Sequence, residues 1–372
     1  MKSGIVPRAL VVPAVLGLAV ANAQPLTPTV LTPLSTALNE TSGLLVIDGQ
    51  VWTQLDSGNP NALYQVDPGT GDVLRTVTVA NASNVDWEDL TTDGTWVYIG
   101  DFGNNSGART DLRVYRVPLT DLLDPGTMAL QADTIMFSYA DQIDFTPANN
   151  ANDRDCEAMI AMDDSLFLFT KNWLSSNTYL YVLPAQPGTQ LAVRRDTLDT
   201  QGLVTGAARD VFSGSVALCG YTTVLTPFIW QLEGFTGHDV FGGSAERHVV
   251  QAPLTQMEGI AWSAPGTLHL TNEQNALAPA RLWSLDVDLA TALPAEERVE
   301  GATAHFDAQA GILTIDTPTA EQLKVIDTAG RVVLQVTLAA GTTRVPTAEW
   351  APGPYVLHMR GLRGDGMLVV AH

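Results

Sequence analysis

Residues 88–101 read Glu-Asp-Leu-Thr-Thr-Asp-Gly-Thr-Trp-Val-Tyr-Ile-Gly-Asp, in which a glutamate opens one strand, an Asp-Gly turn follows, and a second apolar strand ends in an acid. Four more stretches repeat this strand–turn–strand pattern, and three of them also open on a glutamate. They run from Glu40 to Asp56, Glu157 to Lys171, Ala207 to Tyr221 and Glu258 to Glu273. A strand-based unit that recurs at a spacing of about 50 residues is typical of a β-propeller. The sequence therefore predicts an all-β protein whose blades bring equivalent side chains together around one axis.

The predicted β-propeller covers residues 24–292, and five blades are counted in it. A sixth, degenerate blade could lie in the Pro- and Thr-rich lead-in at 24–38 or in the long second unit, where 69 residues separate Glu88 from Glu157. Much of the extra length of the second unit falls in the polar stretch 140–155, which is expected to be a loop. The segment Thr29-Val-Leu-Thr-Pro33 is expected to supply the outer strand that closes the ring.

The two ends of the chain predict export and a second domain. Residues 1–23 combine two basic residues, an apolar run and Ala21-Asn-Ala23, the pattern of a signal peptide. The apolar run is too short for a membrane-spanning helix, and no later stretch is longer. Residues 293–301 are expected to be a linker. Residues 302–372 contain short β-rich runs, and their length suits a small seven-stranded β-sandwich.

The net charge limits which partners the protein is expected to bind, and the two cysteines raise the question of a disulfide. The net charge is −21, or −23 without residues 1–23, and no basic patch is present, so nucleic acid is not an expected partner. Most of the acids are expected to keep the protein soluble, and some of them could bind cations. Cys156 and Cys219 could form a disulfide in an exported protein or could remain buried thiols.

The C-terminal residues carry three ordered motifs: Leu323-Lys-Val-Ile-Asp-Thr-Ala-Gly-Arg-Val-Val, Trp350-Ala-Pro-Gly-Pro-Tyr-Val-Leu-His-Met and Met367-Leu-Val-Val. This region resembles the type A sorting domain of the type IX secretion system of the Bacteroidota. It departs from that family in lacking the Pro-Asn-Pro entry and the basic C-terminal cluster. The resemblance implies passage across the outer membrane by the type IX machinery, followed by secretion or display on the cell surface. An accessory adhesion or carbohydrate-binding sandwich is the alternative.

Two of the repeated units contain a pair of acidic residues that are separated by one residue. Asp86-Trp-Glu88 and Asp155-Cys-Glu157 place two carboxylates on one face of a strand, where they repel unless a cation, Arg or Lys compensates. The loop that begins at Asp101 offers further oxygen atoms, and calcium takes six to eight such ligands. Calcium is therefore the expected cofactor. The candidate ligands are Glu40, Asp56, Asp86, Glu88, Asp101, Asp155, Glu157, Glu258 and Glu273.

Two other roles for these acids remain open. Lys171 and Arg209 could form internal salt bridges with them. The glutamate of each blade could instead bond the backbone N–H groups of the neighbouring blade. Unit four differs from the others, because Ala207 and Tyr221 replace both of its acids.

The motifs Glu40-Thr-Ser-Gly-Leu, Asp86-Trp-Glu-Asp-Leu, Asp155-Cys-Glu-Ala-Met and Met257-Glu-Gly-Ile-Ala are similar to those of the SdiA-regulated and phytase-esterase-like propellers. Two of them correspond to the Asp-x-Glu-Gly motif of that group, with Asp89 and Ala158 in place of the glycine. Met257-Glu-Gly keeps the glycine and lacks the aspartate. The resemblance implies a propeller with calcium bound near its axis.

Three functions fit the sequence. The first is an exported, surface-displayed binding or scaffold propeller with an axial cation. The second is a calcium-dependent hydrolase of phosphate or other esters, although zinc spacing, a Gly-x-Ser-x-Gly elbow and a phosphate-cradling loop are all missing and no catalytic residue is identified. The third is a carbohydrate-binding propeller that uses tryptophans. An unidentified small molecule or glycan is expected to contact Lys171, Tyr221 and Asn272.

Overall fold

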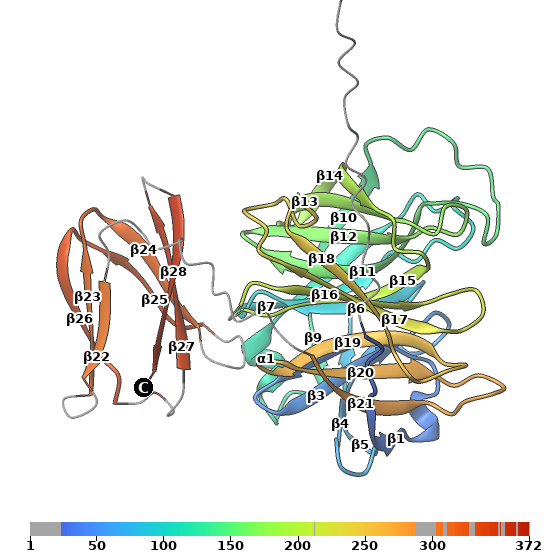
Figure 1. Cartoon of the computed structure of the whole chain (residues 1–372), viewed down its shortest axis with the longest axis horizontal. Coiled ribbons are helices and arrows are strands. Elements are labelled where there is room, and N and C mark those ends of the chain that lie inside the picture. The colour runs from blue at the N-terminus through green and yellow to red at the C-terminus, as the bar shows by residue number, and fades with distance from the viewer. Residues whose placement is uncertain are drawn as a thin grey trace, which may run out of the picture.

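The computed structural model describes residues 24–211, 213–287, 303–307, 311–326, 332–348, 350, 354–361 and 364–371. The predicted signal peptide (1–23) and linker (293–301) lie outside these residues. The described chain is built almost entirely from β-strands (Figure 1). The secondary structure therefore confirms the all-β prediction.

Residues 29–286 form five antiparallel blades of four strands each, and the outer strands of blades two and three pair in parallel, which joins these two blades into one eight-stranded sheet. Blade one contains β2 (Thr41–Ile47), β3 (Gln50–Leu55), β4 (Ala62–Val66) and β5 (Val73–Val79). Blade two contains β6 (Trp87–Thr92), β7 (Trp96–Asp101), β8 (Arg113–Pro118) and β10 (Asp133–Tyr139). Blade three contains β11 (Asp155–Met162), β12 (Ser165–Lys171), β13 (Thr178–Pro184) and β14 (Gly188–Leu198). Blade four contains β15 (Leu203–Arg209), β16 (Val216–Tyr221), β17 (Pro227–Glu233) and β18 (Ser244–Val249). Blade five contains β19 (Gln256–Ala264), β20 (Thr267–Glu273), β21 (Arg281–Asp286) and β1 (Thr29–Pro33).

The five blades close into a ring. Their first strands β2, β6, β11, β15 and β19 contact one another in a complete cycle, so they are the innermost strands around the axis. The strand β1 pairs antiparallel with β21, with Val30 opposite Trp283 (Figure 1). A strand from the start of the propeller thus completes its last blade. Both the count of five and the closing role of Thr29–Pro33 are confirmed.

Neighbouring blades are held together by apolar side chains. One buried cluster joins Trp52 and Val77 of blade one to Trp87 and Ile99 of blade two. Trp52 and Trp87 are fully buried, so they pack blades and present no surface for a sugar ring. The cores between blades make the inner strands a rigid frame for any site on the axis.

The extra length of the second unit has two structural sources. The connection between β8 and β10 contains the helix α1 (Leu119–Leu123) and the short strand β9 (Ala129–Leu130), which pairs in parallel with β5. Residues 140–154 contain no strand, as predicted. The helices in the described part of the chain are α1 and the 3-10 turn η1 (Thr36–Leu38), and neither is long and apolar enough to cross a bilayer.

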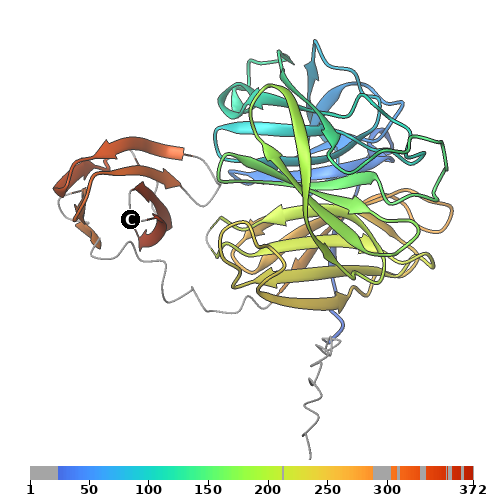
Figure 2. The same ribbon diagram turned by 90° about the horizontal axis from the view of Figure 1, so that it is seen from above.

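The C-terminal strands form the predicted small sandwich. One sheet contains β22 (Thr303–Asp307), β23 (Ile312–Thr317) and β26 (Gly341–Pro346). The other contains β25 (Val332–Leu338), β24 (Glu321–Ile326), β27 (Pro354–Gly361) and β28 (Gly364–Ala371). Leu313, Leu323 and Leu357 bury their side chains in one core between the sheets. Figure 2 shows these strands, in orange and red, curving around a common interior.

The two cysteines are not bonded to each other. Cys156 in blade three and Cys219 in blade four are both free and buried. The alternative of buried thiols is therefore the correct one.

Candidate metal and ligand site

The innermost strand of each blade carries a β-bulge near its start. In β6 the pairing with β7 shifts between Trp87 and Asp89, and the other four inner strands shift at the corresponding place. A bulge adds an unpaired residue to one strand and re-aims its side chain. The bulged residues are Glu88, Glu157, Thr205, Glu258 and, in a wider bulge with Gly43, Ser42. Three glutamates and two hydroxyls thus occupy equivalent places around the axis.

Two of the predicted equivalences are wrong. Spacing along the sequence matched Glu40 and Ala207 with Glu88, whereas the bulges place Ser42 and Thr205 there. The turn between the first two strands of a blade contains two residues after β2 and six after β15. Because turn lengths differ, a constant distance along the chain does not preserve the register of the strands.

A cavity of about 190 Å³ lies at the end of the axis where the inner strands begin. Its lining contains five carboxylates and one ammonium group, together with polar and aromatic side chains. The lining residues are Ser42, Asp56, Glu88, Asn105, Asn150, Glu157, Lys171, Trp173, Tyr221, Gln256, Glu258 and Glu273. The acids that the sequence scattered over more than 200 residues therefore do converge, as the propeller prediction required.

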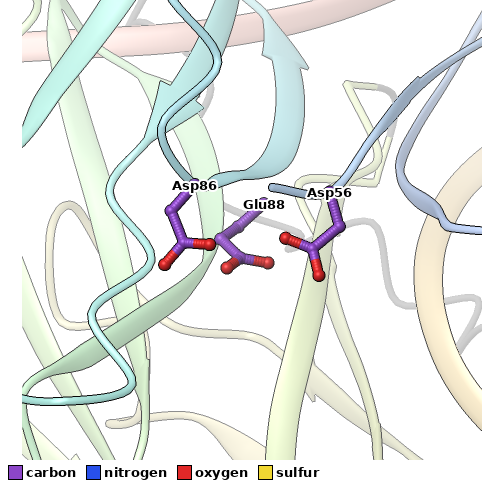
Figure 3. Close-up of side chains that lie close together, drawn as sticks. All are labelled: Asp56, Asp86 and Glu88. Carbon is purple, nitrogen blue, oxygen red and sulfur yellow. The ribbon is translucent and has the colours of Figure 1, made fainter. Parts of the chain in front are cut away.

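Two carboxylates of the cavity wall, Asp56 and Glu88, and a third just outside the lining, Asp86, come close enough to share one cation. Asp56 follows β3, Asp86 precedes β6, and Glu88 is the bulged residue of β6. One oxygen from each lies within 4.8 Å of the other two. Figure 3 shows the three side chains side by side, with their carboxylates extending to the same side. We refer to Asp56, Asp86 and Glu88 as the acidic triad.

A glycine lets the next loop approach the acidic triad. A Cβ at Gly103 would lie 2.1 Å from Glu88 Oε1 and 2.6 Å from the carboxyl carbon of Asp86. Both distances are far below van der Waals contact, so a larger residue there would displace the carboxylates. The loop after β7 consequently packs directly against two members of the triad.

Burial and mutual repulsion disfavour the ionised form of these acids. Burial, together with Asp56 and Asp155, raises the pKa of Asp86 to about 7. Burial and neighbouring carboxylates hold the pKa of Glu88 well above its ordinary value. The same two causes raise the pKa of Glu273 to about 9. Uptake of protons or binding of a cation would therefore relieve the repulsion between these carboxylates.

Lys171 is the one basic residue in the cavity lining among the residues described. Its Nζ lies 3.2 Å from Glu157 Oε1, and the two side chains are 8% and 3% exposed. The ammonium also lies 5.0 Å from the ring centre of Trp173 and 5.6 Å from that of Tyr221. Burial lowers the pKa of Lys171, but Glu157, Tyr221 and Glu258 reverse this and hold it well above its ordinary value. The lysine is thus a fixed positive charge that neutralises one carboxylate of the five.

Like Asp86, the predicted ligands Asp101 and Asp155 lie outside the cavity lining, and both accept hydrogen bonds. Asp101 accepts from Arg109 Nη2 at 3.0 Å and from the backbone N–H of Asp86 at 3.1 Å. Asp155 is fully buried and accepts from the indole N–H of Trp173 at 2.8 Å. Both aspartates therefore position residues at the site, since Asp86 belongs to the triad and Trp173 to the cavity wall.

Glu40 and Asn272 also lie outside the cavity lining. Glu40 is exposed and accepts a hydrogen bond from Asn59 Nδ2 at 2.6 Å. Asn272 is fully buried, and its amide donates to the carbonyl of Pro279 at 3.0 Å and accepts from the indole of Trp283 at 2.8 Å. The Asn272 amide thus makes these hydrogen bonds within blade five. The other two residues expected to contact a ligand, Lys171 and Tyr221, do line the cavity.

The axis is closed below the cavity by Asp89. Its Oδ2 accepts hydrogen bonds from the backbone N–H groups of Met159 at 2.7 Å and Ala207 at 3.3 Å. One side chain of blade two thereby ties the inner strands of blades three and four. Burial holds the pKa of Asp89 well above its ordinary value. This is the inter-blade role that the sequence left open for the glutamates.

Hydroxyl groups perform the same role in two other blades. Ser42 Oγ donates to the carbonyl of Glu88 at 2.6 Å, and Thr205 Oγ1 donates to the carbonyl of Met257 at 2.5 Å. Within the described chain, no backbone N–H donates to the carboxylates of Glu88, Glu157 or Glu258. The bulged glutamates therefore do not bind the backbone N–H groups of neighbouring blades, and all three line the cavity.

The sequence reasoning missed Ser42, Asn150, Trp173 and Gln256 of the cavity wall, whereas Asn105 lies in the loop after Asp101 that was expected to supply oxygens. Gln256 could have been found, because it stands two residues before Glu258, as Asp86 stands before Glu88. The two asparagines come from separate loops that meet through a hydrogen bond from Asn150 N–H to the Asn105 carbonyl at 2.9 Å. No pattern in the sequence predicts that meeting.

No family model and no curated protein matches this sequence. Among solved structures the chain is similar to an exo-β-1,3-galactanase from Phanerochaete chrysosporium, with 10% identity and a TM-score of 0.43 over 92% of this chain and 95% of that chain. It is similar to a periplasmic gluconolactonase of Pseudomonas aeruginosa, with 14% identity and a TM-score of 0.33 over 89% and 99%. A chain of the mitotic checkpoint complex matches with 13% identity and a TM-score of 0.32 over 66% and 63%, so this chain spans less than two thirds of its length. Identities this low concern the fold alone, and TM-scores below 0.5 carry no argument about the site.

Proposed function

We propose that this protein is a binding propeller that holds a calcium ion at its axial cavity and uses the ion to bind an anionic ligand. The observation that carries the proposal is the acidic triad, in which oxygens of Asp56, Asp86 and Glu88 lie within 4.8 Å of one another on rigid strands and strand ends. Uncompensated carboxylates at such distances repel strongly, and a divalent cation removes that cost.

The chemistry of the donor groups favours calcium. The triad offers only carboxylate oxygens, and further oxygens of the cavity wall come from Asn105, Asn150 and Glu157. Calcium accepts six to eight oxygen ligands in flexible geometry, whereas zinc prefers imidazole and thiolate groups. No histidine or cysteine lines this cavity in the described chain. The residues present therefore fit a hard cation.

A calcium ion held by the three carboxylates of the acidic triad would keep coordination sites free for a ligand, because calcium takes six to eight oxygens. The ion would also offset two of the negative charges at the cavity, and Lys171 already offsets that of Glu157. Phosphate or carboxylate oxygens can complete the coordination shell of calcium. We therefore expect the ligand to bind the ion through such an oxyanion group.

Calcium titration of the purified chain by isothermal calorimetry tests the proposal. We expect Glu88→Gln, which keeps the shape and removes one charge, to weaken calcium binding at least tenfold. Glu246→Gln is the matched control, because Glu246 is exposed on β18 of blade four, outside the cavity, and should leave the affinity unchanged. Equal affinities of wild type and Glu88→Gln would contradict the proposal, as would an equal loss in both variants.

A calcium-dependent hydrolase of phosphate or other esters is the second candidate. It is favoured by Glu258, which lies in the same cavity and whose pKa is raised to about 7, mainly by burial. A carboxylate with a pKa near neutrality suits a general base. This candidate predicts turnover of an aryl phosphate or aryl acetate that is lost in both Glu88→Gln and Glu258→Gln. Absence of turnover in the calcium-loaded protein would leave the binding function alone.

For the C-terminal sandwich we propose the sorting role that its sequence resembles. The seven strands and the apolar core around Leu323 and Leu357 support a compact module at the end of the chain. Deletion of residues 302–372 in a host that carries the type IX machinery should leave the propeller in the periplasm. Normal arrival of the truncated protein at the cell surface would refute this role.

A further inference from the structure

Three neighbouring loops at one side of the axial cavity contain no charged residue. They read Thr-Thr-Val-Leu-Thr at 222–226, Gln-Ala-Pro-Leu-Thr at 251–255 and Gln-Asn-Ala-Leu-Ala-Pro-Ala at 274–280. In a chain of net charge −21 this is a marked local departure. Each loop directly adjoins a residue of the cavity wall: Tyr221, Gln256 and Glu273, respectively. We call these three loops the apolar ledge.

Hydrogen bonds join the three loops of the ledge. The backbone N–H of Leu254 donates to the carbonyl of Leu225 at 2.9 Å, and Asn275 Nδ2 donates to the carbonyl of Leu254 at 3.0 Å. Each loop exposes one large apolar side chain. Val224 is 72% exposed, Leu254 46% and Leu277 64%. Three blade loops thus present three uncovered aliphatic groups beside an acidic cavity.

Two leucines of the ledge adopt an unfavourable backbone conformation. Leu225 has φ of 57° and Leu254 has φ of 66°. Glycine or asparagine adopts this left-handed region with less strain than leucine does. An apolar side chain therefore stands at Leu254 at a cost in stability, which is unexpected for a surface loop that only connects strands.

The cavity is too small to enclose a whole organic ligand. Its volume is about 190 Å³, whereas pockets that bury drug-sized molecules hold about 300–1,000 Å³. On one side its wall is formed by the polar loops that meet at Asn105 and Asn150. The ledge adjoins the wall at three other residues. A ligand whose head group fills the cavity consequently has the ledge as an apolar support for the rest of its structure.

We propose that the propeller binds an amphiphilic oxyanion, with its phosphate or carboxylate head in the cavity and its hydrocarbon part on Val224, Leu254 and Leu277. This inference rests on the proposed calcium function, because the free coordination sites of the cation are what bind the oxyanion head. The hydrocarbon part gains from the removal of apolar surface from water on both partners. The head group sets the position, and the ledge sets the preference for an apolar tail.

Calorimetry with the calcium-loaded full chain tests this inference with two pairs of probes: octyl phosphate against methyl phosphate, and octanoate against acetate. We expect the octyl member of at least one pair to bind about tenfold more tightly than its short partner, because several methylene groups leave water. The pair that binds identifies the head group as phosphate or carboxylate. Equal binding of long and short members, or no binding of any probe, overturns the inference.

A ledge variant and a matched control localise the effect. In V224T/L254N/L277S each new residue is polar, and asparagine tolerates the φ of position 254. The advantage of the octyl probe should fall to less than about twofold, while binding of the short probe and of calcium stays unchanged. Leu74→Ser, at a similarly exposed leucine on β5, the outer strand of blade one, should keep the full advantage. An unchanged advantage in the ledge variant refutes the inference.

Two further outcomes separate this inference from its alternatives. If the wild type does not bind calcium, the proposed calcium function itself is refuted. If it binds calcium but shows no preference for the octyl probes, only the proposed role of the ledge is refuted. Size-exclusion chromatography shows whether the wild type self-associates and the ledge variant does not. That result would make a second copy of the chain the occupant and would overturn the amphiphile proposal.

Discussion

The Nζ of Lys171 lies 3.2 Å from Glu157 Oε1 in the wall of the axial cavity, and both side chains are almost completely buried. The two residues come from paired strands of blade three, β11 and β12. A buried charge whose partner is removed is strongly destabilising. The pair therefore compensates Glu157, whereas the other four cavity carboxylates have no ion pair within the described residues: Asp56, Glu88, Glu258 and Glu273.

Removal of the lysine should destabilise the propeller. In metal-free buffer we expect Lys171→Met to lower the free energy of unfolding by about 3 kcal/mol, because Glu157 is left buried without a partner. Urea denaturation measures this change. The double variant Lys171→Met/Glu157→Gln should recover more than half of the loss, since the uncompensated charge is gone. A single variant as stable as wild type would show that the pair contributes little.

Stability of the metal-free protein should fall as pH rises. Burial, Asp56 and Asp155 raise the pKa of Asp86 from 3.8 to about 7 in the folded chain. Between these values the folded state holds a proton that the unfolded chain has released, so stability is lost as pH increases through this window. We expect the Tm of the metal-free protein to decrease from about pH 4 to about pH 7, with a smaller decrease in Asp86→Asn. Calcium should remove most of the decrease, and a Tm that rises over this range would contradict the assignment.

Asp89 should be essential to the closure of the ring. Asp89→Ala leaves the buried N–H groups of Met159 and Ala207 without their acceptor, and each unsatisfied group costs about 1–3 kcal/mol. We expect a loss of at least about 2 kcal/mol in the free energy of unfolding, measured by chemical denaturation. Asp121→Ala, at an exposed position of α1, is the control and should change stability little. Similar stability of the two variants would refute the axial role of Asp89.

Asp101 should act on the cation through Asp86. Its carboxylate accepts the backbone N–H of Asp86 and pairs with Arg109, so it fixes the start of β6. Outer partners of metal ligands typically contribute about 10–100-fold to metal affinity. Asp101→Ala should therefore weaken calcium binding by about tenfold or more, although Asp101 does not line the cavity. Arg116→Ala, which breaks an ion pair with Asp133 elsewhere in blade two, should leave the calcium affinity unchanged.

Much of the fold could be predicted from the sequence, because blade repeats have strong local patterns. The turns after each inner strand and the apolar second strands located all five blades. The closing strand at Thr29–Pro33 was also predictable, since its β-rich segment precedes the first blade and a ring needs one outer strand from the other end of the chain. The fully buried Trp52 and Trp87 match the packing role that tryptophans have between blades.

The site could be predicted only in part. The convergence of Asp56, Glu88, Glu157, Glu258 and Glu273 follows from blade symmetry and was predicted. Bulges and unequal turns are set by hydrogen bonding between strands, so sequence spacing misplaced Glu40 and Ala207. Whether a buried acid faces the cavity or a neighbouring donor depends on loops far along the chain, which is why Asp101 and Asp155 could not be separated from the triad in advance.

The central claim is that the axial acids form a calcium site, and the metal content of the purified full chain tests it most directly. Elemental analysis after dialysis against metal-free buffer should find one calcium ion per chain. Removal of that ion with a chelator should lower the Tm clearly, and added calcium should restore it. Absence of calcium, together with a Tm that neither chelator nor added calcium changes, would contradict the claim.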